Sequence, residues 1–137
     1  MEIKSYFVVT GVVKHNDGFL ILKKSSDDRN YPNKWSFCSG YVKEFESGED
    51  TVLREIKEET GLDAKIVKTG KIMEIIDKNN REHPKKWVVA MYLCEVEKTE
   101  VKLCHENQEF KWVTTQELKD YDFVPGLEKD LNSLGLE

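Results

Sequence analysis

The feature that most constrains this chain is a nearly continuous β-forming run at residues 7–13, which reads Phe-Val-Val-Thr-Gly-Val-Val. A strand with one solvated face alternates apolar and polar residues, whereas an unbroken run is typical of a strand covered on both faces. The sequence Asn16-Asp17-Gly18 then predicts a tight turn, and residues 19–22 predict the return strand of a hairpin. The chain is therefore expected to build a sheet with covering layers on both sides.

A helix is expected at residues 51–60. The acidic turn at 47–50 suits the positive end of a helix dipole, and Gly61 is placed to cap the other end. A small helix from Thr114 or Thr115 to Leu118 and a last helix after Pro125 are also predicted.

Strands are expected at residues 65–76, 87–96 and 110–113, polar loops at 25–34 and 77–86, and a sharp backbone turn at Ser39-Gly40. Strands interleaved with two or three helices indicate an α/β or α+β fold.

The chain of 137 residues contains no repeat and no linker, so one domain spanning residues 1–137 is expected. Its net charge of -5 argues against general binding to the nucleic-acid backbone, which requires a basic surface.

Three cysteines, Cys38, Cys94 and Cys104, have no metal-site spacing and suggest reduced thiols in a cytoplasmic protein. We expect no signal peptide, and no apolar run in the sequence has membrane length. The sequence leaves open whether the protein works as one chain or as a homodimer.

The predicted helix carries a cluster of carboxylates. At about 100° per residue, Val52, Leu53, Ile56 and Thr60 fall on one arc that can face a core. The side chains of Glu55, Glu58 and Glu59 are related by i, i+3 and i+4 and fall on the neighbouring arc. Like charges at this spacing repel each other, and a hard divalent cation would relieve the repulsion. A solvated acidic face is the alternative, and three glutamates alone do not exclude it.

The segment before the helix decides between these alternatives. The pattern begins at Gly40, and five residues separate Gly40 from Glu46. Seven further residues separate Glu46 from the run Arg54-Glu55-Ile56-Lys57-Glu58-Glu59-Thr60-Gly61-Leu62. This pattern resembles the signature of Nudix hydrolases at all nine of its specified positions. The resemblance extends over essentially the full length of the chain. It implies an α/β/α sandwich around a central mixed sheet.

The resemblance also implies roles for individual residues. In Nudix hydrolases this segment holds divalent metal, Mg²⁺ or Mn²⁺, against the diphosphate of a small nucleotide-like substrate. By position, Glu58 and Glu59 would be the main metal ligands, with Glu55 a further ligand or the general base. Gly40 would offer its backbone carbonyl to the metal, and Arg54 would orient the glutamates.

The remaining expectations concern the base and the loop shape. Glu55, Glu106 and Glu109 compete for the role of general base, and the sequence leaves this open. Exposed loop acids are the alternative for the last two. Glu46 is expected to brace the loop. The pattern departs from many Nudix members at Ser39, Phe45, Thr51 and Val52, which can alter the loop without touching a ligand position.

Substrate choice is less constrained. Members that hydrolyse ADP-ribose carry a proline about fifteen residues after the signature, and those that hydrolyse dinucleoside polyphosphates carry a tyrosine slightly further on. Here that region reads Asp-Lys-Asn-Asn at 77–80, which favours a MutT-type nucleoside triphosphate pyrophosphohydrolase. Lys24 is a candidate phosphate contact, and Phe123 is a candidate stacking partner for the base or an ordinary packing residue. Hydrolysis of a nucleotide sugar or an RNA 5′ end, and nucleotide binding without catalysis, are the alternatives.

Overall fold

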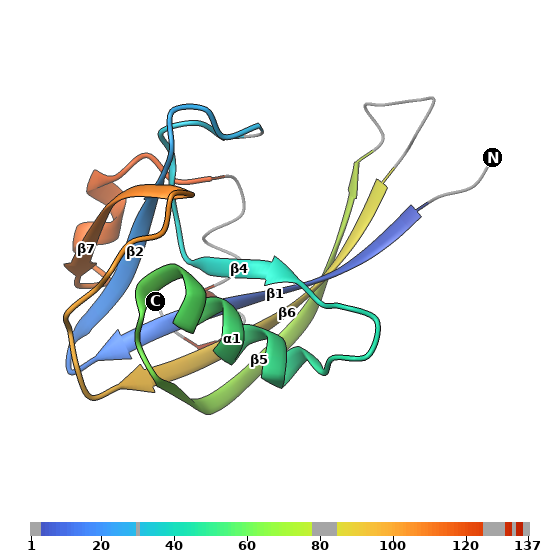
Figure 1. Ribbon diagram of the computed structural model, residues 1–137, viewed down its shortest axis with the longest axis horizontal. Helices are drawn as coiled ribbons and strands as arrows, with labels where there is room; N and C mark the ends of the chain where they lie inside the picture. The colour runs from blue at the N-terminus through green and yellow to red at the C-terminus, as the bar shows by residue number, and fades with distance from the viewer. Residues whose placement is uncertain (1–3, 30, 78–84, 125–130, 133, 136–137) are drawn as a thin grey trace.

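The computed structural model describes residues 4–29, 31–77, 85–124, 131–132 and 134–135. A seven-stranded mixed sheet forms its centre, with β3, β2, β1, β6 and β5 side by side, β4 paired with β1, and β7 paired with β2 (Figure 1). The strands are β1 (Lys4–His15), β2 (Gly18–Lys24), β3 (Trp35–Ser36), β4 (Cys38–Tyr41), β5 (Ala64–Asp77), β6 (Lys85–Val96) and β7 (Asn107–Val113). The β1–β6 pair is parallel and the other pairs are antiparallel.

Strand β1 is buried on both faces, as its unbroken apolar run predicts. Val9 and Val13 belong to a cluster that packs under helix α1 (Gly48–Thr60), whereas Val12 belongs to a second cluster on the opposite face. The alternation follows from the strand geometry, in which successive side chains point to opposite faces. The sheet therefore has two covered faces and two separate sets of core contacts.

Helix α1 lies across one face of the sheet (Figure 1). Its N-terminus is capped by Ser47, whose hydroxyl accepts a hydrogen bond from the Asp50 backbone N–H at 3.1 Å. Its C-terminus is capped by Gly61, which adopts a left-handed conformation with φ of 76°. The predicted core-facing arc is confirmed: Val52, Ile56 and Thr60 are completely buried, and Leu53 is partly buried.

The opposite face is covered by the 3-10 helix η1 (Glu117–Asp120) and part of the C-terminal segment. Leu118 of η1 and Leu134 are both buried in the second cluster. The backbone N–H of Glu117 donates to the Thr114 hydroxyl at 3.3 Å, and the Thr114 N–H donates to the Glu117 carboxylate at 3.0 Å. The helix predicted from Thr114 or Thr115 to Leu118 is therefore replaced by a 3-10 helix that has Gln116 at its N-cap and continues to Asp120, while Thr114 and Glu117 bond to each other ahead of it.

The α+β fold with one central mixed sheet is confirmed, and the predicted strands appear with shifted ends. The sharp turn predicted at Ser39-Gly40 is wrong, because these residues lie in β4 and pair with Thr10 and Val9 of β1. Much of the loop predicted at 77–86 and the start of the helix predicted after Pro125 lie outside the described residues.

Cys38, Cys94 and Cys104 are free thiols, the first two buried. Within the described ranges, the helices are too short and too polar to span a lipid bilayer.

The close packing of α1 on β1 depends on Gly11. A Cβ at this position would lie 2.7 Å from Cγ2 of Val52 and 3.1 Å from Cδ1 of Ile56. Because valine is stiff at χ1, we expect Gly11→Ala to lower the free energy of unfolding by about 1–3 kcal/mol. Denaturant unfolding followed by circular dichroism measures this change.

Gly18→Ala is the matched control for this prediction. A Cβ there meets its nearest neighbour, the His15 carbonyl oxygen, at an ordinary 3.5 Å. The unfolding free energy of Gly18→Ala should stay within about 0.5 kcal/mol of wild type. Equal effects of the two substitutions would show that α1 does not pack tightly over Gly11.

Candidate active site

The site begins where α1 crosses β4. Gly40 pairs with Val9, and a Cβ on Gly40 would lie 2.5 Å from Cγ of Glu55. Only glycine therefore allows the Glu55 side chain to rest on this strand. The Glu55 side chain thus occupies the space that the missing side chain of Gly40 leaves.

Arg54 joins the loop before α1 to the glutamates of the helix. Its Nε and Nη2 atoms each donate to the Glu46 carboxylate at 2.8 Å, and its Nη1 donates to Glu55 at 3.0 Å and to Glu58 at 3.2 Å. The Arg54 guanidinium and the Thr51 hydroxyl lower the pKa of Glu46 to about 2. Glu46 thus braces the loop as expected, and Arg54 orients two of the glutamates.

The three clustered glutamates of α1, Glu55, Glu58 and Glu59, do not share one environment. The Glu58 side chain is 58% exposed, the Glu55 side chain 16%, and residue Glu59 only 7%. Glu59 follows the buried Ile56 by three residues and turns toward the sheet, whereas Glu58 turns toward solvent. The expected common arc is therefore divided into a buried end and an exposed end.

Burial of Glu59 has a large electrostatic consequence. Loss of solvation, followed by repulsion from Glu55 and Glu106, raises the pKa of Glu59 to about 8, while Lys24 and a hydrogen bond from the Ser39 backbone oppose the rise. Burial also raises the pKa of Glu55, and the nearby Arg54 guanidinium opposes that rise. In the absence of a cation, Glu59 is therefore mostly protonated at neutral pH.

The donor set suits a hard divalent cation. Oε2 of Glu59 is buried and has no hydrogen-bond partner among the described residues. Within these residues, no three His, Cys, Asp or Glu side chains form a ready metal cluster. Mg²⁺ typically takes one or two carboxylates and completes its shell with water and substrate phosphate, so these residues fit it. A cation next to Glu59 would supply the positive charge that the buried carboxylate lacks.

Glu106 and Glu109 lie on different sides of the strand pair β2–β7. Glu106 is close enough to raise the pKa values of both Glu55 and Glu59. Glu109 instead forms an ion pair with Lys23 at 3.4 Å. The structure thus brings Glu106, and not Glu109, to the glutamates of α1.

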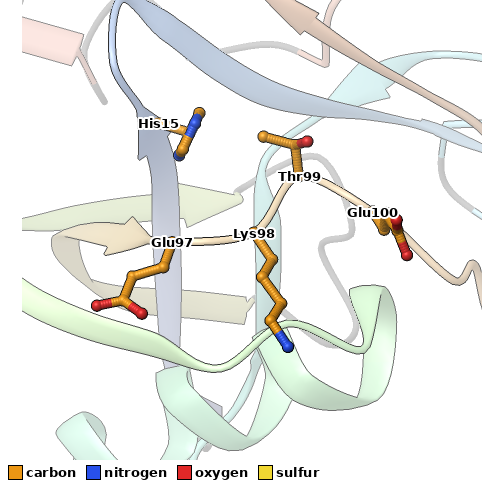
Figure 2. A pocket seen from close by; sticks show the side chains of 5 residues that line it. All are labelled: His15, Glu97, Lys98, Thr99 and Glu100. Carbon is orange, nitrogen blue, oxygen red and sulfur yellow. The ribbon is translucent and has the colours of Figure 1, made fainter.

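Two open hollows in the described part of the chain lie apart from these carboxylates. One, of about 390 Å³, is lined by His15 at the end of β1 and by residues 97–100 after β6 (Figure 2). His15 Nδ1 donates to the Val96 carbonyl at 2.9 Å, and Trp112 Nε1 donates to the Thr99 carbonyl at 3.1 Å. These two hydrogen bonds account for the position of residues 97–100 without a ligand. The other hollow, of about 360 Å³, lies between the β1–β2 turn and residues 114–116.

Comparison with known proteins identifies the fold and the family. The sequence profile of the NUDIX domain matches residues 5–131. The chain is 33% identical to nucleoside triphosphatase NudI of Escherichia fergusonii, over 88% of this chain and 91% of that protein. The chain belongs to the Nudix hydrolase family. Nudix hydrolases generally use divalent metal ions and act on small nucleotide substrates.

Solved structures agree with this Nudix assignment at the level of the fold. The MutT protein from Methanosarcina mazei Go1 has a TM-score of 0.78 at 24% identity, with 95% of this chain and 91% of that chain covered. An Ap4A hydrolase from C. elegans has a TM-score of 0.69 at 20% identity, with 95% of each chain covered.

The two predicted substrate contacts of this Nudix hydrolase lie in different places. Lys24 lies near Glu59, since it lowers the pKa of that carboxyl. Phe123 packs against Phe37 and Tyr121, with ring centroids 6.5 Å and 6.3 Å away, in the cluster on the face opposite α1. The structure therefore groups Lys24 with the carboxylates and Phe123 with a separate aromatic set.

One buried polar residue that pairs with Lys24 is not among the sequence-based candidates. Asn107 is only 7% exposed, and its Nδ2 has no hydrogen-bond partner among the described residues. A lone asparagine at the start of a strand carries no motif, so nothing in the sequence singles it out.

The shift at Glu59 predicts how stability depends on pH in chelator. The ordinary pKa is 4.5 and the folded pKa is about 8, so between these values the folded protein keeps a proton that the unfolded chain releases. The free energy of unfolding should fall as pH rises from about 5 to about 8, by up to about 1.4 kcal/mol per pH unit, and then level off. We expect Glu59→Gln to remove this decline.

Denaturant unfolding from pH 5.5 to 8.5 in EDTA measures the effect. Glu58→Gln is the control, because Glu58 is mostly exposed and should keep the wild-type slope. Parallel pH profiles for wild type and Glu59→Gln would contradict the assigned burial of the Glu59 charge.

Proposed function

We propose that this protein hydrolyses a diphosphate linkage in a nucleoside triphosphate or a related nucleoside diphosphate derivative, with Mg²⁺ or Mn²⁺. A triphosphate would yield a nucleoside monophosphate and pyrophosphate. The name of the 33%-identical relative, nucleoside triphosphatase, supports this substrate class. The residues at 77–80, which lack the proline typical of ADP-ribose hydrolases, favour triphosphates over ADP-ribose.

The observation that carries the proposal is the buried Oε2 of Glu59, which has no hydrogen-bond partner among the described residues and lies near Glu55 and Glu106. A protein interior tolerates grouped carboxylates poorly unless a cation joins them. A group of acids that serves only for solubility would be solvated, as Glu58 is. A buried carboxyl held in its neutral form beside other acids therefore points to a cation, which would stabilise its charged form, and to the anionic ligand of that cation.

The chemistry requires a nucleophile, a base and charge neutralisation. Water attacks one phosphorus, the bridging P–O bond breaks, its electron pair stays with the leaving phosphate, and the proton of the water passes to a carboxylate. Glu58, Glu59, Glu55 and the Gly40 carbonyl would hold the metal. When bound, the metal neutralises the phosphates and activates the water.

The chain's own residues position these groups. Arg54 fixes the carboxylates of Glu55 and Glu58, and Lys24 supplies a positive charge beside Glu59. Glu55 and Glu106 remain the candidates for the base. Both lie near Glu59, and burial raises the pKa of Glu55 toward the range that suits proton transfer.

Release of phosphate or pyrophosphate across a nucleotide panel tests the proposal. With Mg²⁺ or Mn²⁺, nucleoside triphosphates should be cleaved faster than ADP-ribose, nucleotide sugars or 5′-triphosphorylated RNA. Excess EDTA should abolish turnover, because the acidic group cannot hold a diphosphate without a cation. Undiminished turnover in EDTA would refute the metal mechanism, and a clear preference for ADP-ribose would refute the substrate class.

Glu58→Gln separates function from stability. The side chain is exposed and forms one surface ion pair with Arg54, so the metal-free variant should unfold within about 1 kcal/mol of wild type. Turnover should fall by about a hundredfold or more, because the substitution removes a metal ligand. Mg²⁺ should raise the melting temperature of wild type more than that of the variant.

Thermal melts with and without Mg²⁺, together with turnover, measure these outcomes. Glu109→Gln is the matched control, since it also removes an exposed carboxylate in an ion pair but lies outside the acidic group. A strongly destabilised Glu58→Gln with normal turnover would make Glu58 a structural residue.

A further inference from the structure

Asn107 is a buried residue that begins β7 directly after Glu106 and pairs with Lys24 of β2. The residue is 7% exposed, and its Nδ2 has no hydrogen-bond partner among the residues that the structure describes. A buried amide donor without an acceptor is unfavourable, and such a group in a native protein calls for a partner, which can be a bound ligand, an ion or an ordered water. The backbone of Asn107 is satisfied separately, because its N–H donates to the Cys104 carbonyl at 3.3 Å.

A β-bulge determines where the Asn107 side chain points. Lys24 is paired with Asn107 and Lys23 with Glu109, so Gln108 is the extra residue of the β2–β7 ladder. The Gln108 amide fixes the bulge by donating to the Lys24 carbonyl at 2.8 Å and to Asn33 Oδ1 at 2.7 Å. Paired residues share a face, so Asn107 lies on the face of Lys24 and Glu109 on the face of Lys23.

The α1 face is the one that Asn107 and Lys24 share. Along β2, Leu20 and Leu22 pack in the cluster under α1, and alternation places Lys24 on the same side. The effect of Lys24 on the pKa of Glu59 agrees with this placement. The bulge thus brings an amide donor to the region that holds Lys24, Glu106 and Glu59.

Two buried atoms of this region are complementary but do not bond to each other. Nδ2 of Asn107 is a donor, Oε2 of Glu59 is an acceptor, and neither has a hydrogen-bond partner in the described structure. A cation would satisfy the carboxylate, and an anionic oxygen would satisfy the amide. A diphosphate with its divalent cation supplies both.

We propose that Asn107 is a substrate-positioning residue whose Nδ2 donates a hydrogen bond to an anionic oxygen of the substrate diphosphate, next to Lys24. This inference rests on the proposed function. Since none of the described residues accepts a hydrogen bond from this donor, we expect its contribution to appear on binding of the diphosphate. The residue acts on affinity and leaves the chemical step to the carboxylates.

Steady-state kinetics and calorimetry test this role in Asn107→Ala and in the isosteric Asn107→Asp. The probes are the α,β-methylene analogues of ATP and UTP with Mg²⁺, which bind without being cleaved. For Asn107→Ala, KM and the Kd of the analogues should rise about tenfold or more, with kcat within about threefold of wild type. Asn107→Asp should bind more weakly still, because it places a carboxylate against the phosphate.

Two further measurements separate this role from a structural one. Metal-free Asn107→Ala should melt at or above the wild-type temperature, because it removes an unsatisfied buried donor. Glu109→Gln is the control on the same strand, and its KM should stay within about twofold of wild type, since its side chain faces Lys23. A large loss of stability in Asn107→Ala would show that the amide has a structural partner.

The outcomes distinguish this inference from the proposed function. Active wild type with unchanged KM and Kd in Asn107→Ala overturns the inference alone. A shifted pH profile of kcat with unchanged KM also overturns it, because the amide would then act on Glu59. If wild type binds the analogues without hydrolysing any nucleotide, and Asn107→Ala binds them more weakly, the inference stands and the proposed function fails. Wild type that binds neither analogue and hydrolyses no nucleotide of the panel overturns both.

Discussion

The close approach of α1 to the sheet is the constraint on which the rest of this structure depends. Two glycines permit it: Gly11 of β1 lies under Val52 and Ile56, and Gly40 of β4 lies under Glu55. Because the helix rests directly on backbone, residues on its inner side lose solvent whether they are apolar or charged. The same contact that completes the core therefore also desolvates two carboxylates.

That desolvation makes the charged forms of the two carboxyls unfavourable, and nearby positive groups offset this cost only in part. The positive charge of Arg54 offsets the negative charge of Glu46, Glu55 and Glu58, to which its guanidinium donates hydrogen bonds. Arg54 makes no comparable bond to Glu59, whose carboxyl has a pKa of about 8 in the absence of a cation. Stability given up in this way is common at sites whose ligand restores the balance.

The strand pair β2–β7 contributes further residues near the acidic cluster, and a β-bulge sets their positions. An unbroken ladder would send residues 107 and 109 to the same face, but the bulge at Gln108 separates them. Glu109 consequently pairs with Lys23, while Asn107 and Lys24 lie toward α1. The additional residue Gln108 thus places Glu109 on one face of the strand pair and Asn107 on the other.

The sequence by itself determined the buried hairpin, the bounds of α1 to within a few residues and the identity of the acidic signature, because each depends on local periodicity, caps or fixed spacing. It also indicated the family, which the comparisons confirm. Only the tertiary structure decided that Ser39 and Gly40 extend as β4, that Glu59 is buried while Glu58 is exposed, and that Glu106 rather than Glu109 approaches them. These outcomes depend on which surfaces α1, β1 and β7 present to one another. Helical spacing places three glutamates near each other, but solvation, and with it the charge of each carboxyl, is set by residues distant in the chain.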